Sequence, residues 1–476
     1  MTDANDIAQK QGTAALRKVI DKNTFTRPPA QSDEALALRF AERHSCDRRY
    51  VAKFGKWYLY DGARWREDDT LETNNLVREI CREAAAECRK KKSWSRSLAS
   101  AGTVAAVERL ARSDRRLAAT ADQWDQDLWV LNTPAGLVDL RTGKIRPHRP
   151  EDFATKLTGT APDETCTIET WLKFLQRVCG DGAELISFLR RVAGYALTGA
   201  TSEHALFFLY GTGANGKSTF LNALTAALGD YHKTSPIETF TASAADRHPT
   251  DLAGLRGARL VTSVETEEGR RWAESKIKSL TGGDRIAARF MRQDFFEFTP
   301  IFKLVVAGNH KPGLRNVDEA IRRRFNLVPF TVTIPADERD ETLGDKLKAE
   351  LPGILAWAIG GCLEWQERGL DAPAVVRDAT NAYLEGEDAL AAWIEDVGEY
   401  DADAWESSSA LYRSWKSWCD RTGEHSGSLK KFSQRLEDRG AAIGVRKGRN
   451  SDGLRGFYGL RVTKPDLVSG AAEAAT

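Results

Sequence analysis

Four short, mostly apolar runs stand out in the 476-residue chain, over residues 205–210, 258–264, 302–307 and 325–330. Continuous apolar runs of this length are typical of strands that are buried on both faces of a parallel sheet. Stretches with helical periodicity separate several of these runs. The pattern therefore predicts an α/β domain over residues 201–335.

The residues before this domain predict two further parts. Residues 1–33 are polar and predict a flexible arm. Residues 34–200 predict a mainly helical domain, because helical patterns cover residues 71–120 and 168–198. Short strands are expected within this domain, around the Asp61-Gly62 turn and over Leu131–Leu140.

The residues after the α/β domain predict a helical segment and a small separate domain. Residues 336–400 are expected to form helices that pack on the α/β domain, and the stretch Asp401-Ala402-Asp403 is interpreted as a linker. Residues 405–465 show two helical patterns followed by a strand-turn-strand pattern. Residues 466–476 predict a flexible tail.

The composition argues against a bulk electrostatic attraction to nucleic acid. Lysine and arginine number 69 against 68 acidic residues, so nucleic-acid binding would have to come from local basic patches. The seven cysteines form no Cys-x-x-Cys pair, which indicates reduced thiols in a cytoplasmic protein. The sequence contains no signal peptide and no apolar run near the ~20 residues of a membrane helix, so no membrane partner is expected.

A glycine-rich loop directly follows the first apolar run. Gly211–Thr219 matches the pattern G-x-x-x-x-G-K-[ST], in which backbone N–H groups surround phosphate oxygens at the positive end of a helix. Lys217 is expected to reach the β- and γ-phosphates, and Ser218 to hold Mg²⁺. The predicted nucleotide-binding residues are Gly211, Thr212, Gly213, Ala214, Asn215, Gly216, Lys217, Ser218 and Thr219. The alternative is a plain glycine-rich turn, which the strand-loop-helix context disfavours.

Two acidic residues follow the second run. Glu265 and Glu267 are two residues apart, so on an extended chain both carboxylates point the same way and both can face a γ-phosphate. One would hold the metal's water shell, with Glu265 as the candidate, and the other would polarise the attacking water. The spacing does not decide between the two roles, and a solvated acidic loop is the alternative.

Polar residues also follow the third run. Asn309 can orient the lytic water and sense the γ-phosphate, although an asparagine at this place is often a turn residue. Arg322, Arg323 and Arg324 lie about a dozen residues later. In an NTPase that works as a ring, an arginine from a neighbouring subunit stabilises transition-state charge. Arg323 and Arg324 are the candidates for this role, and a solvated basic face is the alternative.

Two basic regions are candidates for contacting DNA. Residues 286–298 read as two short strands around Arg292, and this basic and aromatic hairpin suits a phosphate backbone. The candidate contacts in this region are Lys276, Lys278, Arg289 and Arg292. The alternative is an edge hairpin whose aromatic side chains belong to the core.

The second basic region is the tail of the chain. Residues 426–461 carry nine basic against three acidic residues, and Arg446 and Lys447 lie in the strand-turn-strand pattern. A helix followed by a basic, glycine-rich hairpin suggests a winged helix on DNA. A protein-docking domain with a solvated basic face is the alternative.

Taken in order, these motifs resemble a superfamily 3 helicase, and more narrowly the helicase part of the phage and plasmid primase family related to the poxvirus primase-helicase. The strings that carry the resemblance are Gly211–Thr219, residues 265–269, residues 278–284, residues 307–312 and Arg322–Arg324. The resemblance implies an α/β fold with a P-loop AAA+-like ATPase core, an N-terminal mainly helical domain and a small C-terminal winged-helix-like domain. It also implies ATP and Mg²⁺ as cofactors.

The resemblance carries roles onto individual residues. Lys217 and Ser218 look like the Walker A pair, Glu265 and Glu267 like the Walker B acids, and Asn309 like the sensor. Residues 276–292 cover the segment that touches single-stranded DNA in the pore of the ring, and Arg323 or a neighbour matches the arginine finger. Family members often have a tryptophan before the arginine pair, where this chain has Arg322. Because of this departure, the resemblance does not identify which arginine acts as the finger.

The resemblance also implies partners and a reaction. The expected protein is an ATP-dependent DNA helicase or translocase of a phage, prophage or plasmid replication system. It would form a homo-oligomeric ring, expected to be a hexamer, with single-stranded DNA in the pore and duplex or forked DNA at the C-terminal domain. The arm over residues 1–33 is too short for a primase, so a separate primase or polymerase is an expected partner. The alternative is an ATP-dependent replication initiator or scaffold that recruits host proteins without unwinding.

Overall fold

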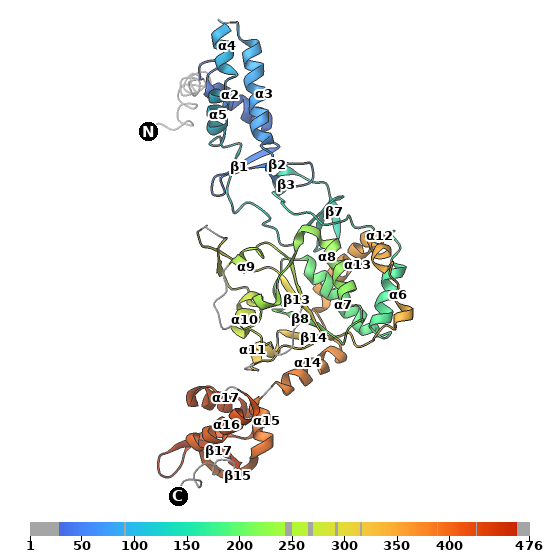
Figure 1. The fold of residues 1–476 in the computed structure, drawn as a ribbon, viewed down its shortest axis with the longest axis vertical. Helices are drawn as coiled ribbons and strands as arrows, with labels where there is room; N and C mark the ends of the chain where they lie inside the picture. The colour runs from blue at the N-terminus through green and yellow to red at the C-terminus, as the bar shows by residue number, and fades with distance from the viewer. Residues whose placement is uncertain are drawn as a thin grey trace, which may run out of the picture. The chain divides into compact units, whose positions relative to one another are not determined.

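The computed structural model describes residues 28–89, 92–242, 250–264, 270–290, 294–314, 317–387, 389–424 and 426–463 (Figure 1). The chain divides into two compact units. One holds the residues up to Asp127 together with Arg146–Leu157, and the other holds Leu128–Ile145 together with the residues from Thr158 onward. The region that the sequence predicts as one domain over residues 34–200 is therefore shared between two units.

The first unit combines helices with a small sheet. Its helices are α2 (Asp33–His44), α3 (Glu72–Glu87), α4 (Lys92–Leu98) and α5 (Ala101–Ala111). Its described strands are β1 (Arg48–Val51), β2 (Lys56–Tyr60), β3 (Trp65–Glu67) and β4 (Ala118–Ala119), in the sheet order β3-β2-β1-β4. Phe40, Val77, Ile80 and Val107 are fully buried between the helices. The predicted helices and the strands beside Asp61 are confirmed, whereas β1 and β4 were not predicted.

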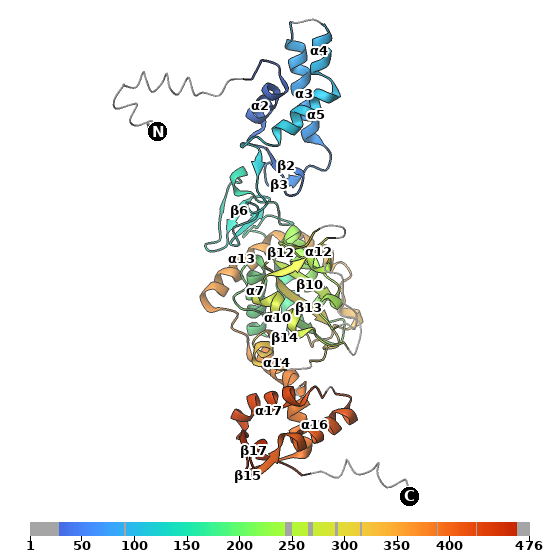
Figure 2. The same cartoon turned by 90° about the vertical axis from the view of Figure 1, so that its left-hand side faces the viewer.

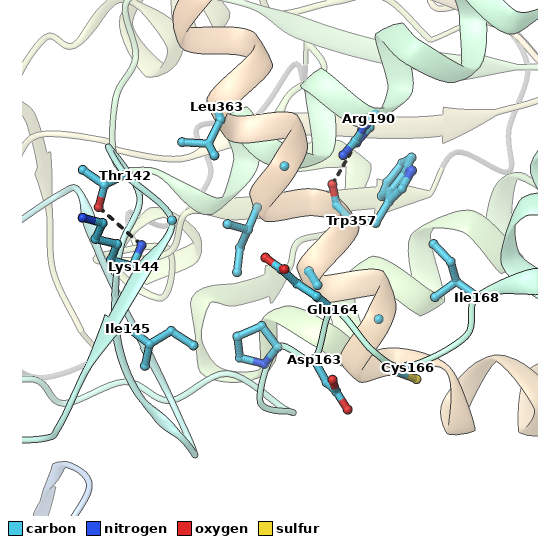
Figure 3. Close-up of a pocket in the computed structure, with 16 residues that line it drawn as sticks. Thr142, Lys144, Ile145, Asp163, Glu164, Cys166, Ile168, Arg190, Trp357 and Leu363 are labelled. Atoms are coloured by element: carbon cyan, nitrogen blue, oxygen red, sulfur yellow. Dashed lines mark hydrogen bonds between the residues drawn. The ribbon is translucent and has the colours of Figure 1, made fainter.

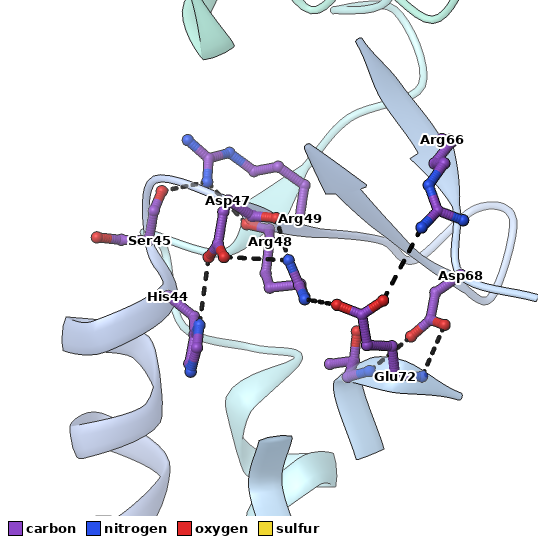
Figure 4. Close-up of polar contacts among 9 residues, drawn as sticks. His44, Ser45, Asp47, Arg48, Arg49, Arg66, Asp68 and Glu72 are labelled. Carbon is purple, nitrogen blue, oxygen red and sulfur yellow. Dashed lines mark hydrogen bonds and ion pairs between the residues drawn. The ribbon is translucent and has the colours of Figure 1, made fainter. Parts of the chain in front are cut away.

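A polar network joins α2, β1 and α3 in this unit (Figure 4). The buried Arg48 guanidinium donates to Asp47 Oδ2 at 3.1 Å and to Glu72 Oε1 at 2.5 Å. Asp68 accepts hydrogen bonds from the backbone N–H groups of Glu72 and Thr73 at the start of α3. These contacts satisfy first-turn donors of α3 and fix the strand against the helix.

The second unit is built on a parallel sheet. Its described strands lie in the order β14-β8-β13-β10-β9, and every neighbouring pair is parallel. The strands are β8 (Leu206–Tyr210), β9 (His232–Thr234), β10 (Leu260–Val264), β13 (Lys303–Gly308) and β14 (Phe325–Pro329). The four predicted parallel strands are confirmed, and β9 is an additional edge strand.

Helices cover both faces of this sheet (Figure 2). Phe207, Leu209 and Val305 share a core with helices on one face, and Leu206, Phe208 and Val306 share a second core on the other. The first face carries α6 (Glu169–Val178), α7 (Ala183–Leu197), α8 (Lys217–Leu228), α12 (Leu343–Ala349) and α13 (Leu351–Arg368). The second carries α10 (Glu274–Gly282), α11 (Glu319–Arg322) and α14 (Ala374–Gly386). Strands of this sheet are thus apolar on both faces, as a parallel sheet requires.

Smaller elements complete this part of the unit. They are β5 (Val130–Thr133), β6 (Gly136–Asp139), β7 (Lys144–Arg146), α9 (Thr250–Ala253), β11 (Ile286–Ala288) and β12 (Phe296–Phe298). The antiparallel pair β5–β6 is the turn and strand that the sequence predicts over Leu131–Leu140.

Two buried cations tie the C-terminal end of α7 to the sheet. The Arg259 guanidinium donates to the carbonyl oxygens of Leu197 and Val130, each at 2.7 Å. The Lys303 ammonium donates to the carbonyl oxygen of Thr198, and burial lowers the pKa of Lys303. Carbonyl groups at a helix C-terminus carry partial negative charge, so both cations lie where the helix dipole stabilises them.

The edge strand β9 gives a testable pH dependence. His232 Nε2 lies 2.7 Å from Thr262 Oγ1 of β10, and burial lowers the pKa of His232 to about 4. The imidazole is therefore neutral in the folded chain at pH values where it is already protonated in the unfolded chain, whose pKa is about 6.5. Above pH 6.5 this group does not lower the free energy of unfolding, and below it the free energy of unfolding falls as the pH falls. We expect the free energy of unfolding to fall by roughly 1–2 kcal/mol from pH 7 to pH 5 through this group. Chemical denaturation of the wild type and His232→Gln at both pH values measures the difference, and an equal pH dependence would contradict it.

The C-terminal elements form a separate core at the red end of the chain (Figure 1). They follow in the order α15 (Ala389–Val397), β15 (Gly398–Ser407), α16 (Ser408–Thr422), α17 (Leu429–Ile443), β16 (Arg446–Arg449) and β17 (Arg455–Val462). The sheet is antiparallel in the order β15-β17-β16. Asp401–Asp403 is not a linker, because it lies in β15 at a register irregularity. The core also includes α15, which the sequence assigned to the helical segment ending at residue 400.

Candidate nucleotide-binding site

The P-loop lies between β8 and α8, at the carboxyl end of the sheet. Gly216 has φ of +84°, and a Cβ there would lie 2.5 Å from Val178 Cγ1. A Cβ on Gly211 would lie 2.0 Å from both Asn215 Nδ2 and the carbonyl oxygen of Phe330. Gly216 therefore requires glycine for its backbone conformation and for close packing, and Gly211 requires it for close packing.

Lys217 is held inside this loop. Its side chain is buried, and Nζ donates to the carbonyl oxygen of Gly211 at 2.8 Å, to Asn215 Oδ1 at 2.9 Å and to Asn309 Oδ1 at 3.1 Å. All three acceptors are uncharged, and burial lowers the pKa of Lys217. A phosphate oxygen that replaced one of these acceptors would supply a full negative charge to a poorly solvated ammonium. The structure thus brings Lys217 together with Asn309, which directly follows β13.

The start of α8 offers further groups for a phosphate and its metal. Gly216 is the N-cap and has no side chain to accept from the first-turn N–H groups, so these donors are available to an anion. Ser218 is exposed on this first turn and Thr219 is half-buried. The hydroxyl of Ser218 is a suitable Mg²⁺ ligand beside phosphate oxygens. Among the described residues there is no cluster of three or more His, Cys, Asp or Glu side chains that could hold a metal without phosphate.

The acidic candidates cannot be placed. β10 ends at Val264, which is in register with Ala307 of β13, and Asn309 lies two residues beyond Ala307. Glu265 and Glu267 follow Val264 in the sequence and lie outside the described residues. Their assignment to the metal and to the attacking water stays a prediction.

The candidate arginines face different surroundings. Arg324 is buried, with Nε donating to Thr281 Oγ1 at 3.1 Å and Nη1 to the carbonyl oxygen of Ala320 at 2.6 Å. Burial lowers the pKa of Arg324, and Arg323 beside it adds repulsion. Arg323 itself is exposed and Arg322 is half-buried. Arg324 therefore joins α11 to α10 within one chain, and Arg323 is the member of the pair whose side chain is exposed.

The predicted hairpin is present as the antiparallel pair β11–β12. Ala288 and Phe298 are buried, whereas Phe290 and Phe295 near the turn are 40% and 60% exposed. The Arg289 guanidinium lies 4.8 Å from the centre of the Phe295 ring. The aromatic residues are thus divided, because those in the strands pack inward and those beside the turn remain accessible.

The basic candidates around the hairpin differ in what they contact. Lys278 Nζ lies 2.5 Å from Asp318 Oδ2, and Asp318 also caps α11. Lys276 is half-buried on α10. Arg292 lies outside the described residues. Lys278 therefore has a structural partner, which leaves Arg289 as the described candidate nearest the hairpin turn.

In the C-terminal core, Arg446 and Lys447 are adjacent residues of β16, so their side chains point to opposite faces of the sheet. Both residues are exposed, and Lys447 Nζ pairs with Glu437 of α17 at 2.6 Å. The two candidates therefore cannot act on DNA from the same face of the strand.

Sequence reasoning did not single out two groups at the P-loop. The carbonyl oxygen of Phe330 accepts from Asn215 Nδ2 at 2.6 Å, and Lys311 Nζ lies 4.2 Å from the centre of the Tyr210 ring. A main-chain carbonyl has no sequence signal. Lys311 lies two residues after the sensor candidate, in the string Asn309-His310-Lys311, and this closeness is a signal that could have found it.

A cavity in the same unit is separate from these groups. Its volume is about 750 Å³, and α13, β7 and residues 162–168 line it (Figure 3). Arg190 Nε donates to the carbonyl oxygen of Trp357 at its wall. None of its lining residues belongs to the P-loop, so this cavity is distinct from the candidate nucleotide site.

Comparisons with known proteins found two family models and several viral relatives. Residues 37–180 match the family model described as "D5 N terminal like", and residues 209–324 match a "Family of unknown function (DUF5906)". The chain is 24% identical over 295 residues to "Putative helicase L207/L206" of Acanthamoeba polyphaga mimivirus, and 28% identical over 276 residues to "Putative helicase 022R" of Frog virus 3. These matches support a relationship to the phage- and poxvirus-type primase-helicase family.

The alignments to the two viral relatives cover only part of each protein. The two alignments span 57% and 53% of this chain but only 31% and 28% of the viral proteins. The chain therefore spans about a third of the length of the curated relatives that it matches. The structure is also similar to "The apo structure of NrS-1 C terminal region (305-718)", with a TM-score of 0.52, 10% identity, and coverage of 90% of this chain and 100% of that chain. This likeness concerns the fold alone.

Proposed function

We propose that the chain is an ATP-dependent DNA helicase or translocase that serves a phage, prophage or plasmid replication system in the cytoplasm. The single observation that carries the proposal is the hydrogen bond from Lys217 Nζ to Asn309 Oδ1 at the carboxyl end of the parallel sheet. A P-loop lysine in contact with a polar residue that directly follows the neighbouring strand of the sheet is an arrangement that can sense the γ-phosphate. The helicase names of the viral relatives support the same direction.

ATP and Mg²⁺ are the proposed cofactors of a P-loop, AAA+-like core. The first-turn N–H groups of α8 and the Lys217 ammonium would bind the phosphates, and Ser218 would hold the metal. The metal would neutralise charge on the β- and γ-phosphate oxygens. Glu265 or Glu267 would hold its water shell, and the other would orient the attacking water. Asn309 would contact that water or the γ-phosphate.

Hydrolysis is proposed to occur at subunit interfaces of a homo-oligomeric ring, with a hexamer as the expected form. The exposed Arg323 would reach the ATP of the neighbouring subunit, and the buried Arg324 would hold the helical turn that presents it. ATP turnover would then depend on assembly, because the finger is supplied in trans.

DNA is proposed to bind in two places. The hairpin β11–β12 would contact single-stranded DNA in the pore through Arg289, Arg292 and the exposed Phe295. The C-terminal elements, in the order helix, strand, two helices and two strands, suit a winged-helix-like domain that binds duplex or forked DNA. A separate primase or polymerase is the proposed replication partner.

The test of this proposal is the dependence of ATP hydrolysis on DNA. We expect single-stranded DNA to raise the rate of phosphate release by the wild-type chain, since strand binding in the pore is coupled to turnover. The loss of affinity with salt should follow the number of phosphates contacted, with a slope of about −0.7 per contact. Turnover that is insensitive to single-stranded DNA at every salt concentration would contradict a pore-driven translocase.

The C-terminal domain gives a separate prediction. Arg446→Glu should weaken binding to forked or duplex DNA more than Lys447→Glu, because Lys447 is already paired with Glu437 and points to the other face of β16. Reversing one phosphate contact should cost about tenfold in affinity at moderate salt. Fluorescence anisotropy with a labelled fork measures both variants, and the Lys447→Glu variant is the matched control. An equal effect of the two changes would contradict a single DNA-binding face on β16.

A further inference from the structure

Asn215 occupies an unusual place in the P-loop, because its side chain is turned inward. It is only 3% exposed, although it lies in a loop that is otherwise partly open to solvent. Oδ1 accepts from Lys217 Nζ at 2.9 Å, and Nδ2 donates to the carbonyl oxygen of Phe330 at 2.6 Å. The amide therefore bridges the phosphate-binding lysine and the residue that follows β14.

The neighbouring backbone fits around this bridge. A Cβ on Gly211 would strike both Asn215 Nδ2 and the Phe330 carbonyl oxygen at 2.0 Å, so the glycine leaves room for the contact. Phe330 N–H donates to the carbonyl oxygen of Tyr210, and Ile334 N–H donates to the carbonyl oxygen of Ala214 at 2.9 Å. The chain is thus bound to the segment that leaves β14 at Tyr210 and Ala214 through the backbone, and at Asn215 through its side chain.

Few side chains can replace this amide. One end must accept from an ammonium and the other must donate to a carbonyl, at the length of an asparagine. An aspartate has the same size but, when ionised, only accepts, so it would face the Phe330 carbonyl oxygen with a second acceptor. An alanine would leave that carbonyl and the Lys217 ammonium each without one partner in a buried site.

We infer that Asn215 is a positioning residue for Lys217, which holds the ammonium at the phosphate site and the loop in its binding conformation before the triphosphate arrives. The inference rests on the proposed function only as far as ATP binding. Asn215 and Asn309 together form a cradle of two amide oxygens around Lys217 Nζ. When a phosphate binds, Nζ can exchange one amide for a phosphate oxygen without a rearrangement of the loop.

The inference is tested by measuring ATP affinity in the full chain with Mg²⁺, by titration with a fluorescent ATP analogue and by the KM for ATP. The variants are Asn215→Ala and Asn215→Asp. Asn222→Ala is the matched control, since Asn222 is an exposed asparagine of the same helix-loop unit, on α8. Thermal unfolding of each variant without nucleotide reports whether the variant folds. If Asn215→Ala does not fold, the test rests on Asn215→Asp, which preserves the size of the side chain.

A positioning role predicts a distinct order of affinities. Asn215→Ala should weaken ATP binding roughly 10- to 100-fold, the cost of a hydrogen bond to a charged group. Asn215→Asp should bind ATP still more weakly, because its carboxylate competes with phosphate for Lys217 and repels it. Asn222→Ala should stay within about twofold of the wild type. A role in packing alone would reverse the order of these two affinities. Asn215→Asp would then bind ATP more tightly than Asn215→Ala, since aspartate fills the site and alanine does not.

The contrary results are clear. The inference is overturned if Asn215→Asp binds ATP as well as the wild type, or if Asn215→Ala matches Asn222→Ala. If the wild-type chain binds ATP but separates no DNA strands, the proposed helicase function fails and the result on Asn215 stands. If the wild-type chain binds no ATP, both fail.

Discussion

Replacing Lys217 by alanine is expected to abolish ATP turnover. The change removes the ammonium that lies 3.1 Å from the sensor candidate Asn309 and that would contact the β- and γ-phosphates. A unit charge about 4 Å from another contributes about 4 kcal/mol in a partly buried site, which corresponds to roughly a thousandfold in rate. Phosphate release at saturating ATP and DNA measures this loss.

The loss must be separated from a general loss of folding. Lys233→Ala removes an exposed lysine of the edge strand β9 and should leave turnover near that of the wild type. Thermal unfolding of both variants without nucleotide shows whether a change in turnover comes from a change in folding. Turnover by Lys217→Ala above about a tenth of the wild-type rate would remove the P-loop from the mechanism.

Arg323→Ala should retain ATP binding but lose hydrolysis by roughly a thousandfold or more, the range for an arginine finger. The matched change, Arg324→Ala, should act on stability, since it removes buried hydrogen bonds to Thr281 and Ala320. We expect about 2–3 kcal/mol of lost stability for Arg324→Ala, because the bonds involve a charged donor. ATP affinity, turnover and chemical denaturation of both variants separate the two roles.

Mixing experiments distinguish an arginine that acts in trans from one that acts within its own subunit. Arg323→Ala subunits mixed with Lys217→Ala subunits should recover part of the activity, because an intact site then forms where a normal P-loop meets a normal arginine. No recovery at any ratio, in assemblies shown to contain both variants, would argue against a finger in trans. Equal stability losses for Arg323→Ala and Arg324→Ala would argue against their different roles.

The central sheet was predictable because its strands are buried on both faces. The apolar runs that became β8, β10, β13 and β14 need no knowledge of distant contacts to be recognised. β9 has the sequence His-Lys-Thr and only three residues, so nothing in its local pattern marks a strand. β15 contains Asp401 and Asp403 at an irregular register, and its acidic residues resemble a linker. The division of residues 34–200 between two units depends on non-local contacts, which local patterns do not contain.

The candidate site was predictable in its order but not in its contacts. The order of motifs places Lys217 and Asn309 at one end of the sheet, because parallel strands end at the same edge. The inward turn of Arg324 and the bridge from Asn215 to Phe330 depend on tertiary packing. Three adjacent arginines look alike in a sequence. Only their surroundings in the folded chain distinguish an arginine with buried hydrogen bonds from one with an exposed side chain.

Strand displacement from a forked duplex tests the central claim most directly. The wild-type chain with ATP and Mg²⁺ should release the labelled strand in the presence of an excess trap strand, and Lys217→Ala, or ATP replaced by a non-hydrolysable analogue, should release none. Such a result is the one that an ATP-driven translocase predicts. ATP-dependent binding to the fork with no strand released, at any enzyme concentration that supports ATP hydrolysis, would contradict the account and favour an initiator that assembles on DNA without unwinding it.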